Sequence, residues 1–236
     1  MTQQPRAAGL PRYALYRISN TDPAAIRMRV SSDIPEWRVT LLNSALQVNI
    51  VPLVGTTWCM EGWFNFNRAT AVWGLMSLMD SSTPKRAVTL GTNGGGALQL
   101  LNYIQAPIGI SSQPDIGSWI HLAVVCRSGT CDVYHQGTLV FTTTPTNTSF
   151  SGLTTILSVG RVVDGDGYDW QGQVSFSHIR ISNIRRYSSN FTPAFPLDND
   201  NATVTLLRGN PVAGATVLGA GTVTYSSMPA LGSYIP

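Results

Sequence analysis

The sequence is poor in charged residues, and the shortage is greatest for the two that favour helices. Charged residues make up 11% of the 236 residues, with one lysine (Lys85) and two glutamates (Glu36 and Glu61). Glutamate and lysine usually cover the exposed surfaces of helices, and about a quarter of a soluble domain is normally charged. Valine, isoleucine, threonine, glycine, serine and asparagine are abundant instead, which favours short strands joined by turns. The composition therefore predicts an all-β protein.

Long apolar runs are also absent. No run approaches the ~18 residues of a membrane-spanning helix, and the first residues lack the apolar stretch of a signal peptide. We therefore expect no membrane span and no secretion through a cleaved leader. The net charge of +3 comes from residues 1–40, which hold six arginines and three acids. This sparse excess disfavours nucleic acid as a partner.

The cysteines are few, and their spacing does not match a zinc site. Cys126 and Cys131 flank a four-residue turn, so we expect them to face each other across two antiparallel strands. An oxidising compartment would let the pair close, but without a secretory signal we expect free thiols. Cys59 lies in an apolar run and is expected to be a small core residue.

The chain divides into three zones. Residues 1–40 contain prolines at spacings that forbid a long helix, and we expect them to form an N-terminal arm. Residues 41–208 contain many short strand-like runs separated by turns, which is typical of a sandwich or jelly roll. Residues 209–236 form an uncharged C-terminal arm. A free tail of this composition would aggregate, so we expect it to pack on its own domain or on a neighbouring subunit.

The residue pattern predicts the strands of the central zone and the faces of two of them. Both faces of Trp119–Val125 are apolar, as in a central strand that is covered on both sides. In Phe176–Ile181, Arg180 is expected to face solvent. The expected strands are Ala45–Val51, Thr57–Phe66, Val72–Met79, Ala97–Tyr103, Trp119–Arg127, Thr130–Tyr134, Thr138–Thr143, Thr155–Gly160, Gly172–Ile181 and Thr203–Leu207.

The sequence lacks the patterns of the common hydrolases. Retaining glycosidases need two carboxylates about 5–5.5 Å apart, and no acid lies two residues from Glu61. A nucleophile elbow and a phosphate-binding loop are also missing. His121 lies on an expected central strand, where a hydrogen-bonded core histidine is favoured over a catalytic base. We therefore predict that the protein is not an enzyme and has no catalytic residues.

The densest acidic cluster lies at residues 164–169. A glycine-containing turn with several carboxylates suits Ca²⁺, and the candidate ligands are Asp164, Asp166 and Asp169. The alternative is an ordinary polar hairpin loop that binds no cofactor. Tyr168 and Trp170 beside these acids are the best candidates for an aromatic platform that binds a sugar. Three other tryptophans are expected in the core instead: Trp58, Trp63 and Trp119.

Three segments carry a family resemblance. Thr57–Phe66 places Glu61 among aromatic and apolar residues. Trp119–Val140 holds two strand patterns, with Gln136 where Asp or Asn is usual. Leu157–Pro193 passes through Trp170 and ends in an Arg-Tyr and Phe-Thr-Pro exit. Together these segments resemble the concanavalin A-like lectin/glucanase jelly rolls of the laminin-G-like and pentraxin-like type, as found in phage and virus structural proteins.

The resemblance implies a two-sheet antiparallel jelly-roll sandwich with extended arms at both ends. It implies a non-enzymatic structural or interaction protein of a virion, such as a capsid decoration or tail fibre subunit. The expected partners are the major capsid or tail proteins and further copies of the chain, and the expected location is the virion, assembled in the host cytoplasm. The alternative is a carbohydrate-binding lectin module that recognises glycans on the host surface.

Overall fold

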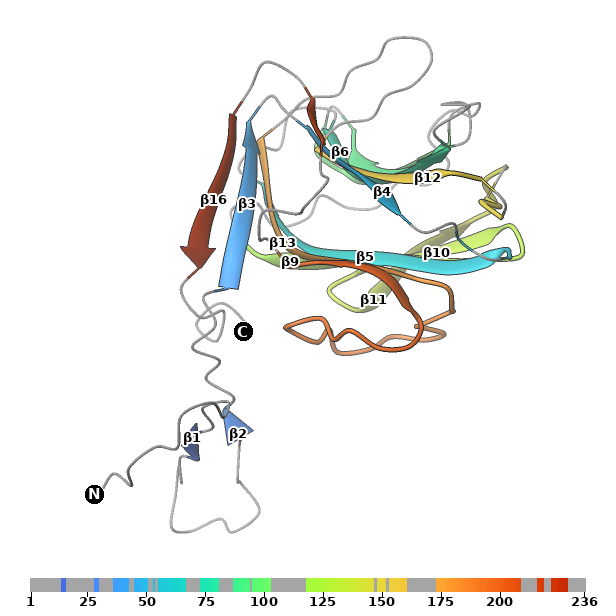
Figure 1. The fold of residues 1–236 in the computed structure, drawn as a ribbon. Helices are drawn as coiled ribbons and strands as arrows, with labels where there is room; N and C mark the ends of the chain where they lie inside the picture. The colour runs from blue at the N-terminus through green and yellow to red at the C-terminus, as the bar shows by residue number, and fades with distance from the viewer. Residues whose placement is uncertain are drawn as a thin grey trace. The chain divides into compact units, whose positions relative to one another are not determined.

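The fold is made of strands, and the chain forms two compact units, residues 37–226 and residues 1–36 with 227–236 (Figure 1). The computed structural model describes residues 14–15, 28–29, 36–42, 45–50, 53, 55–66, 73–80, 87–93, 95–102, 118–146, 148–151, 153–160, 173–208, 216–218 and 222–228. No helix in these ranges is long and apolar enough to cross a membrane. In the smaller unit, β1 (Ala14–Leu15) pairs with β2 (Met28–Arg29).

Two antiparallel sheets face each other in the larger unit (Figure 1). The eight-stranded sheet has the order β11 (Thr138–Thr143), β10 (Thr130–His135), β9 (Ile120–Arg127), β5 (Thr57–Phe66), β13 (Gln173–Ser182), β3 (Glu36–Leu42) and β16 (Thr222–Met228), with β14 (Thr203–Leu207) also paired to β13. The six-stranded sheet has the order β15 (Thr216–Leu218), β4 (Ala45–Ile50), β12 (Thr155–Val159), β6 (Trp73–Asp80), β7 (Ala87–Thr92) and β8 (Leu98–Asn102). This confirms the predicted two-sheet jelly-roll sandwich.

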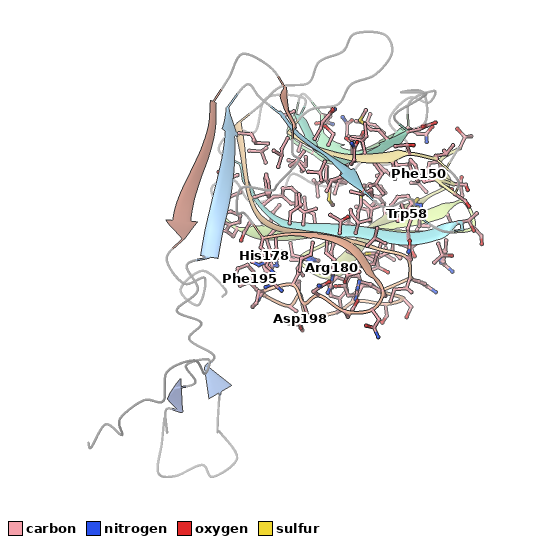
Figure 2. The ribbon with its side chains drawn as sticks, in the orientation of Figure 1. Trp58, Phe150, His178, Arg180, Phe195 and Asp198 are labelled. Atoms are coloured by element: carbon pink, nitrogen blue, oxygen red, sulfur yellow. A yellow bond between two sulfur atoms is a disulfide. The ribbon has the colours of Figure 1, made fainter. Side chains whose placement is uncertain are left out.

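The core lies between the two sheets because the strands alternate their side chains between an inner and an outer face. Met60 of β5, Leu122 of β9 and Leu157 of β12 belong to one buried cluster. Trp58 is buried there against Phe150 (Figure 2), and its Nε1 donates a hydrogen bond of 2.8 Å to the Thr148 carbonyl. The expectation that three tryptophans are buried is confirmed for Trp58, Trp63 and Trp119.

Four strands of the sandwich were not predicted with their bounds from the sequence. β3 starts inside the zone predicted to be an arm, and β7 is a short run that is not among the predicted strands. β15 and β16 lie in the glycine-rich C-terminal zone. β15 pairs with β4, with Thr216 opposite Gln47. The described part of the C-terminal zone therefore adds strands to its own sandwich, one of the two arrangements expected for it.

The cysteine pair lies as predicted, but its chemical state differs from the prediction. Arg127 pairs with Thr130 across a two-residue turn, so Cys126 and Cys131 form the next pair, with Cα atoms 4.1 Å apart. Side chains approach closely at such positions of an antiparallel ladder. The structure joins the two sulfurs in a disulfide, so the expectation of free thiols is wrong for this structure. Cys59 is a buried free thiol, as expected.

Candidate functional site

The sugar-binding and calcium candidates all lie outside the described residues: Asp164, Asp166, Tyr168, Asp169 and Trp170. The strands that flank them are described. β12 ends at Val159, opposite Leu46 of β4. β13 begins at Gln173, and its second residue, Val174, lies opposite Phe66 of β5. The candidates therefore lie in the connection between β12 of one sheet and β13 of the other, residues 161–172. Within the described ranges, no three His, Cys, Asp or Glu residues are grouped to hold a metal ion.

The best-defined polar site is on the outer face of the eight-stranded sheet, beneath residues 183–202, which we call the exit segment. This segment connects β13 to β14 and runs along that face (Figure 1). Aromatic contacts hold it there: Phe195 packs edge-on against Trp63, and Phe191 packs against Tyr134. The indole Nε1 of Trp63 also donates a hydrogen bond of 3.0 Å to the Ala194 carbonyl. The exit segment thus shields the sheet face from water.

Glu61 is the centre of this site and is completely buried. Its Oε1 accepts a hydrogen bond of 2.9 Å from Arg180 Nε and lies 2.7 Å from an Arg180 terminal nitrogen. Its Oε2 accepts a hydrogen bond of 2.6 Å from the Tyr187 hydroxyl and lies 3.1 Å from His121 Nε2. Arg186 lies 3.6 Å from Oε1. One carboxylate therefore joins β5, β9, β13 and the exit segment.

The charge of Glu61 is stabilised by these partners despite its burial. Burial by itself raises the pKa of the carboxyl group, but the hydrogen bond and charge of His121, the charge of Arg180 and the hydrogen bond from Tyr187 together lower the pKa below 4.5. The pKa of the Tyr187 hydroxyl is raised, first by burial and then by the adjacent Glu61 charge. Glu61 is thus an ionised acceptor and Tyr187 a neutral donor at ordinary pH.

Arg180 does not face solvent, which corrects the prediction from the sequence. It does point to the outer face of β13, as the alternation required, but the exit segment covers that face and Arg180 is only 6% exposed. Its Nη1 donates a hydrogen bond of 2.7 Å to the Asp198 carbonyl in the exit segment. Figure 2 shows Arg180, His178, Phe195 and Asp198 together on this side of the sheet, away from Trp58 and Phe150.

The same contacts show what the site does chemically. A glycosidase carboxylate must contact its substrate and work with a second carboxylate. Glu61, in contrast, is buried, and its two oxygens contact Arg180, Tyr187 and His121. The prediction of a hydrogen-bonded core histidine is confirmed for His121. The site is a buried network that attaches the exit segment to the sheet.

A second ion pair extends the network to the surface. Arg186 donates to both carboxylate oxygens of Asp200, at 2.9 and 2.7 Å, and its Nε donates to the Ser182 hydroxyl at 2.6 Å. The Arg186 hydrogen bonds lower the pKa of Asp200, against the smaller opposing effect of burial. The residue pattern did not predict this network, although the lone Glu61 in an apolar strand was a signal for it, because a buried charge needs partners.

The two-sheet sandwich is a jelly roll of the lectin-like class. Comparisons with known proteins identify its family. A model of the concanavalin A-like lectin/glucanases superfamily matches residues 42–194. The chain therefore belongs to this superfamily, as the three segments predicted. A search of curated proteins found no match.

Solved structures show the same fold at low sequence identity. One is a putative carbohydrate-binding protein from Bacteroides ovatus, with 12% identity and a TM-score of 0.58 over 83% of this chain. The match spans 60% of the length of that protein. Another is the heptameric SAP-like pentraxin from Limulus polyphemus, with 12% identity and a TM-score of 0.53 over 79% of this chain and 96% of the pentraxin. At this identity the likeness establishes the fold alone.

Proposed function

We propose that the protein is a carbohydrate-binding lectin module and that it does not hydrolyse the sugar it binds. The observation that supports binding over hydrolysis is the state of Glu61, the acid of the family-like segment Thr57–Phe66. Its carboxylate is completely buried and is engaged by Arg180, Tyr187 and His121. A carboxylate in this state cannot protonate a glycosidic oxygen or attack a sugar, because both roles need direct contact with the substrate.

The superfamily and the fold support a sugar as the ligand. The chain belongs to a superfamily that contains lectins, and the Bacteroides ovatus protein of the same fold is described as putatively carbohydrate-binding. We place the sugar at the connection 161–172, where Tyr168 and Trp170 would stack on it. Asp164, Asp166 and Asp169 would accept its hydroxyl hydrogen bonds or hold a calcium ion that does so.

A glycan array tests the proposal with the intact chain, with calcium and again with a chelator. We expect binding to a defined set of glycans, and its loss in Asp166→Ala and Tyr168→Ala. Asp198→Ala is the matched control, because Asp198 is an exposed acid of the exit segment. Bound glycans should be recovered uncleaved. An array without hits in either buffer, or release of shortened sugars, would overturn the proposal.

The role in a virion stays a prediction, because the superfamily and the similar structures concern the lectin-like domain and do not bear on it. We keep it as a second proposal, in which the domain is a capsid decoration or tail-associated subunit that binds capsid or tail proteins and other copies of itself. It is compatible with sugar binding, since a host-recognition subunit would do both. Light scattering on the intact chain tests self-association, and a strictly monomeric chain would count against it.

A further inference from the structure

Two arginines share one carboxylate at the end of the sandwich where β5 begins. Arg127, at the end of β9, has a terminal nitrogen 3.5 Å from Asp132 Oδ2. Arg185, in the exit segment, has one 3.8 Å from the same oxygen. The two nitrogens are therefore no farther apart than the sum of those distances. Asp132 is nearly buried, whereas the Arg127 and Arg185 side chains are 45% and 32% exposed.

Arg127 and Arg185 share a single carboxylate, whereas other arginines on the same face of the sheet each have a carboxylate partner of their own. Arg180 has the carboxylate of Glu61, and Arg186 has the carboxylate of Asp200. Among the described residues, Arg127 and Arg185 have only Asp132 as an acidic partner, at distances longer than those of a strong charge-assisted hydrogen bond. Asp132 also accepts a hydrogen bond of 2.8 Å from the Thr142 hydroxyl. Within the described residues, the two guanidinium groups therefore carry one positive charge more than their acidic partner, and both side chains are partly exposed.

Both arginines are held in place before any ligand arrives. Arg127 is paired with Thr57 on one side and Thr130 on the other, and its hairpin is closed by the disulfide of the next residue pair. Arg185 Nε donates a hydrogen bond of 3.1 Å to the Tyr187 carbonyl, and the Tyr187 hydroxyl is attached to Glu61. A site with positions fixed in advance loses little conformational freedom on binding.

We propose that Arg127 and Arg185 form an anion subsite that accepts the carboxylate or sulfate group of an acidic glycan. Planar guanidinium groups match the oxygens of such groups and bind them with two parallel hydrogen bonds. The glycan as carrier of the anion rests on the proposed function, whereas the anion subsite itself does not. It lies at the first residue of β5, where Arg127 pairs with Thr57, whereas the start of β13 lies at the other end of β5, where Val174 pairs with Phe66.

The subsite is tested on the intact protein by NMR of the arginine Nε–H groups during titration with sodium sulfate or sodium acetate at constant ionic strength. We expect saturable shifts at Arg127 and Arg185 and only small linear shifts at Arg208, an exposed arginine at the end of β14. Equal, unsaturated shifts at all three arginines would overturn the proposal. Because this titration uses the unsubstituted chain, it does not depend on whether a variant folds.

Single substitutions then identify the source of the anion. A sulfated chondroitin oligosaccharide and its desulfated form serve as glycan probes for the unsubstituted chain, Arg127→Gln, Arg185→Gln and the control Arg208→Gln. Each single change leaves one guanidinium beside Asp132, which favours folding. We expect the sulfated probe to bind about tenfold more weakly to R127Q and R185Q, the loss of one charge-assisted contact, and equally to R208Q.

The outcomes separate this inference from the proposed function. Glycan binding that ignores the sulfate group and both substitutions would overturn the subsite while the lectin proposal stands. Saturable sulfate binding without binding to any glycan would support the anion subsite, with a free anion as its ligand, and would overturn both the glycan carrier and the lectin proposal. Preference for the sulfated probe that is lost in both variants supports the full inference.

Discussion

Tyr187 donates a hydrogen bond of 2.6 Å to the carboxylate of Glu61, which is 126 residues earlier in the chain. The Tyr187 ring also stacks on Phe191, with the ring centroids 3.5 Å apart and the planes 4° from parallel. Phe191 in turn contacts His121 and Tyr134 of the sheet. The exit segment is therefore attached to the sheet by a charge-assisted hydrogen bond and by an aromatic cluster. Tyr187 takes part in both, and Phe191 joins it in the cluster.

Removal of the Glu61 charge should destabilise the fold strongly. Glu61→Gln leaves Arg180 buried without its carboxylate, and loss of one member of a buried pair costs about 3–5 kcal/mol. Tyr187→Phe removes one hydrogen bond to the charged group and should cost about 1.5–3 kcal/mol. Urea unfolding followed by tryptophan fluorescence measures both losses in free energy of unfolding.

The control for these two variants is Asp198→Asn, which changes an exposed acid of the same segment. Its free energy of unfolding should stay within about 0.5 kcal/mol of the unsubstituted chain. If E61Q proved as stable as this control, Glu61 would not be the anchor of the exit segment.

Stability should fall between pH 6.5 and pH 4 because of His178. Burial, and secondarily the charge of Arg208, lowers the pKa of His178 from 6.5 to about 4. The unfolded chain therefore takes up a proton at a higher pH than the folded chain. The folded state keeps its full advantage above pH 6.5 and loses up to about 3 kcal/mol as the pH falls to 4, below which this loss is complete.

Urea unfolding at pH 7, 5 and 4 measures this dependence, and His178→Asn should flatten it in that window. The lowered pKa of Glu61 produces a separate loss of stability that begins below pH 4.5 and remains in the variant. An unchanged slope between pH 6.5 and 4 in H178N would show that His178 does not titrate as its buried position requires.

The sequence predicted the strands of the central zone well because short runs of β-branched, aromatic and apolar residues are separated there by turn residues. Thr57–Phe66, Thr138–Thr143 and Thr203–Leu207 have the predicted bounds, and the other seven predicted strands differ by one residue at one or both ends. For the C-terminal zone, packing on its own domain was one of two expectations, and the bounds of β15 and β16 were not predicted because their pairing depends on distant strands. Propensity describes short segments, whereas sheet order is a property of the whole chain.

The network around Glu61 could be predicted only in part. The sequence placed His121 in the core and Arg180 on the outer face of its strand, and both are correct. It did not show that residues 183–202 would fold back over that face, so Arg180 was expected in solvent. A local pattern gives the direction of a side chain, and the covering segment then decides whether that direction leads to water or to Glu61.

The thiols of the chain should be distinguishable by alkylation. In denaturant without a reductant, we expect one thiol to be labelled, that of Cys59, because Cys126 and Cys131 are joined in a disulfide. With a reductant, all three should be labelled. In the native state Cys59 should resist labelling, since it is buried and burial raises the pKa of its thiol. Mass spectrometry counts the labels, and three labels without a reductant would contradict the disulfide.

Two hairpin turns offer a matched test of how closely the exit segment approaches the sheet. Gly129 and Gly137 both follow a residue with positive φ and themselves have φ of 89° and 75°. A Cβ on Gly129 would meet no atom within 4 Å, whereas a Cβ on Gly137 would lie 1.9 Å from the Phe191 carbonyl oxygen. The Phe191 amide also donates a hydrogen bond of 2.9 Å to the Gly137 carbonyl.

Gly129→Ala should therefore lower the free energy of unfolding by about 1–2 kcal/mol, because alanine disfavours the positive φ of this position. Gly137→Ala carries the same term and must also displace the exit segment at Phe191, which adds about 1–3 kcal/mol. Urea unfolding compares the two variants, and limited proteolysis should cut G137A, but not G129A, within residues 183–202. Equal losses of stability and equal protection would mean that the backbone conformation alone matters and that the exit segment does not press on the turn. A larger loss with selective cleavage would show that this turn is a docking point for the segment that covers Glu61.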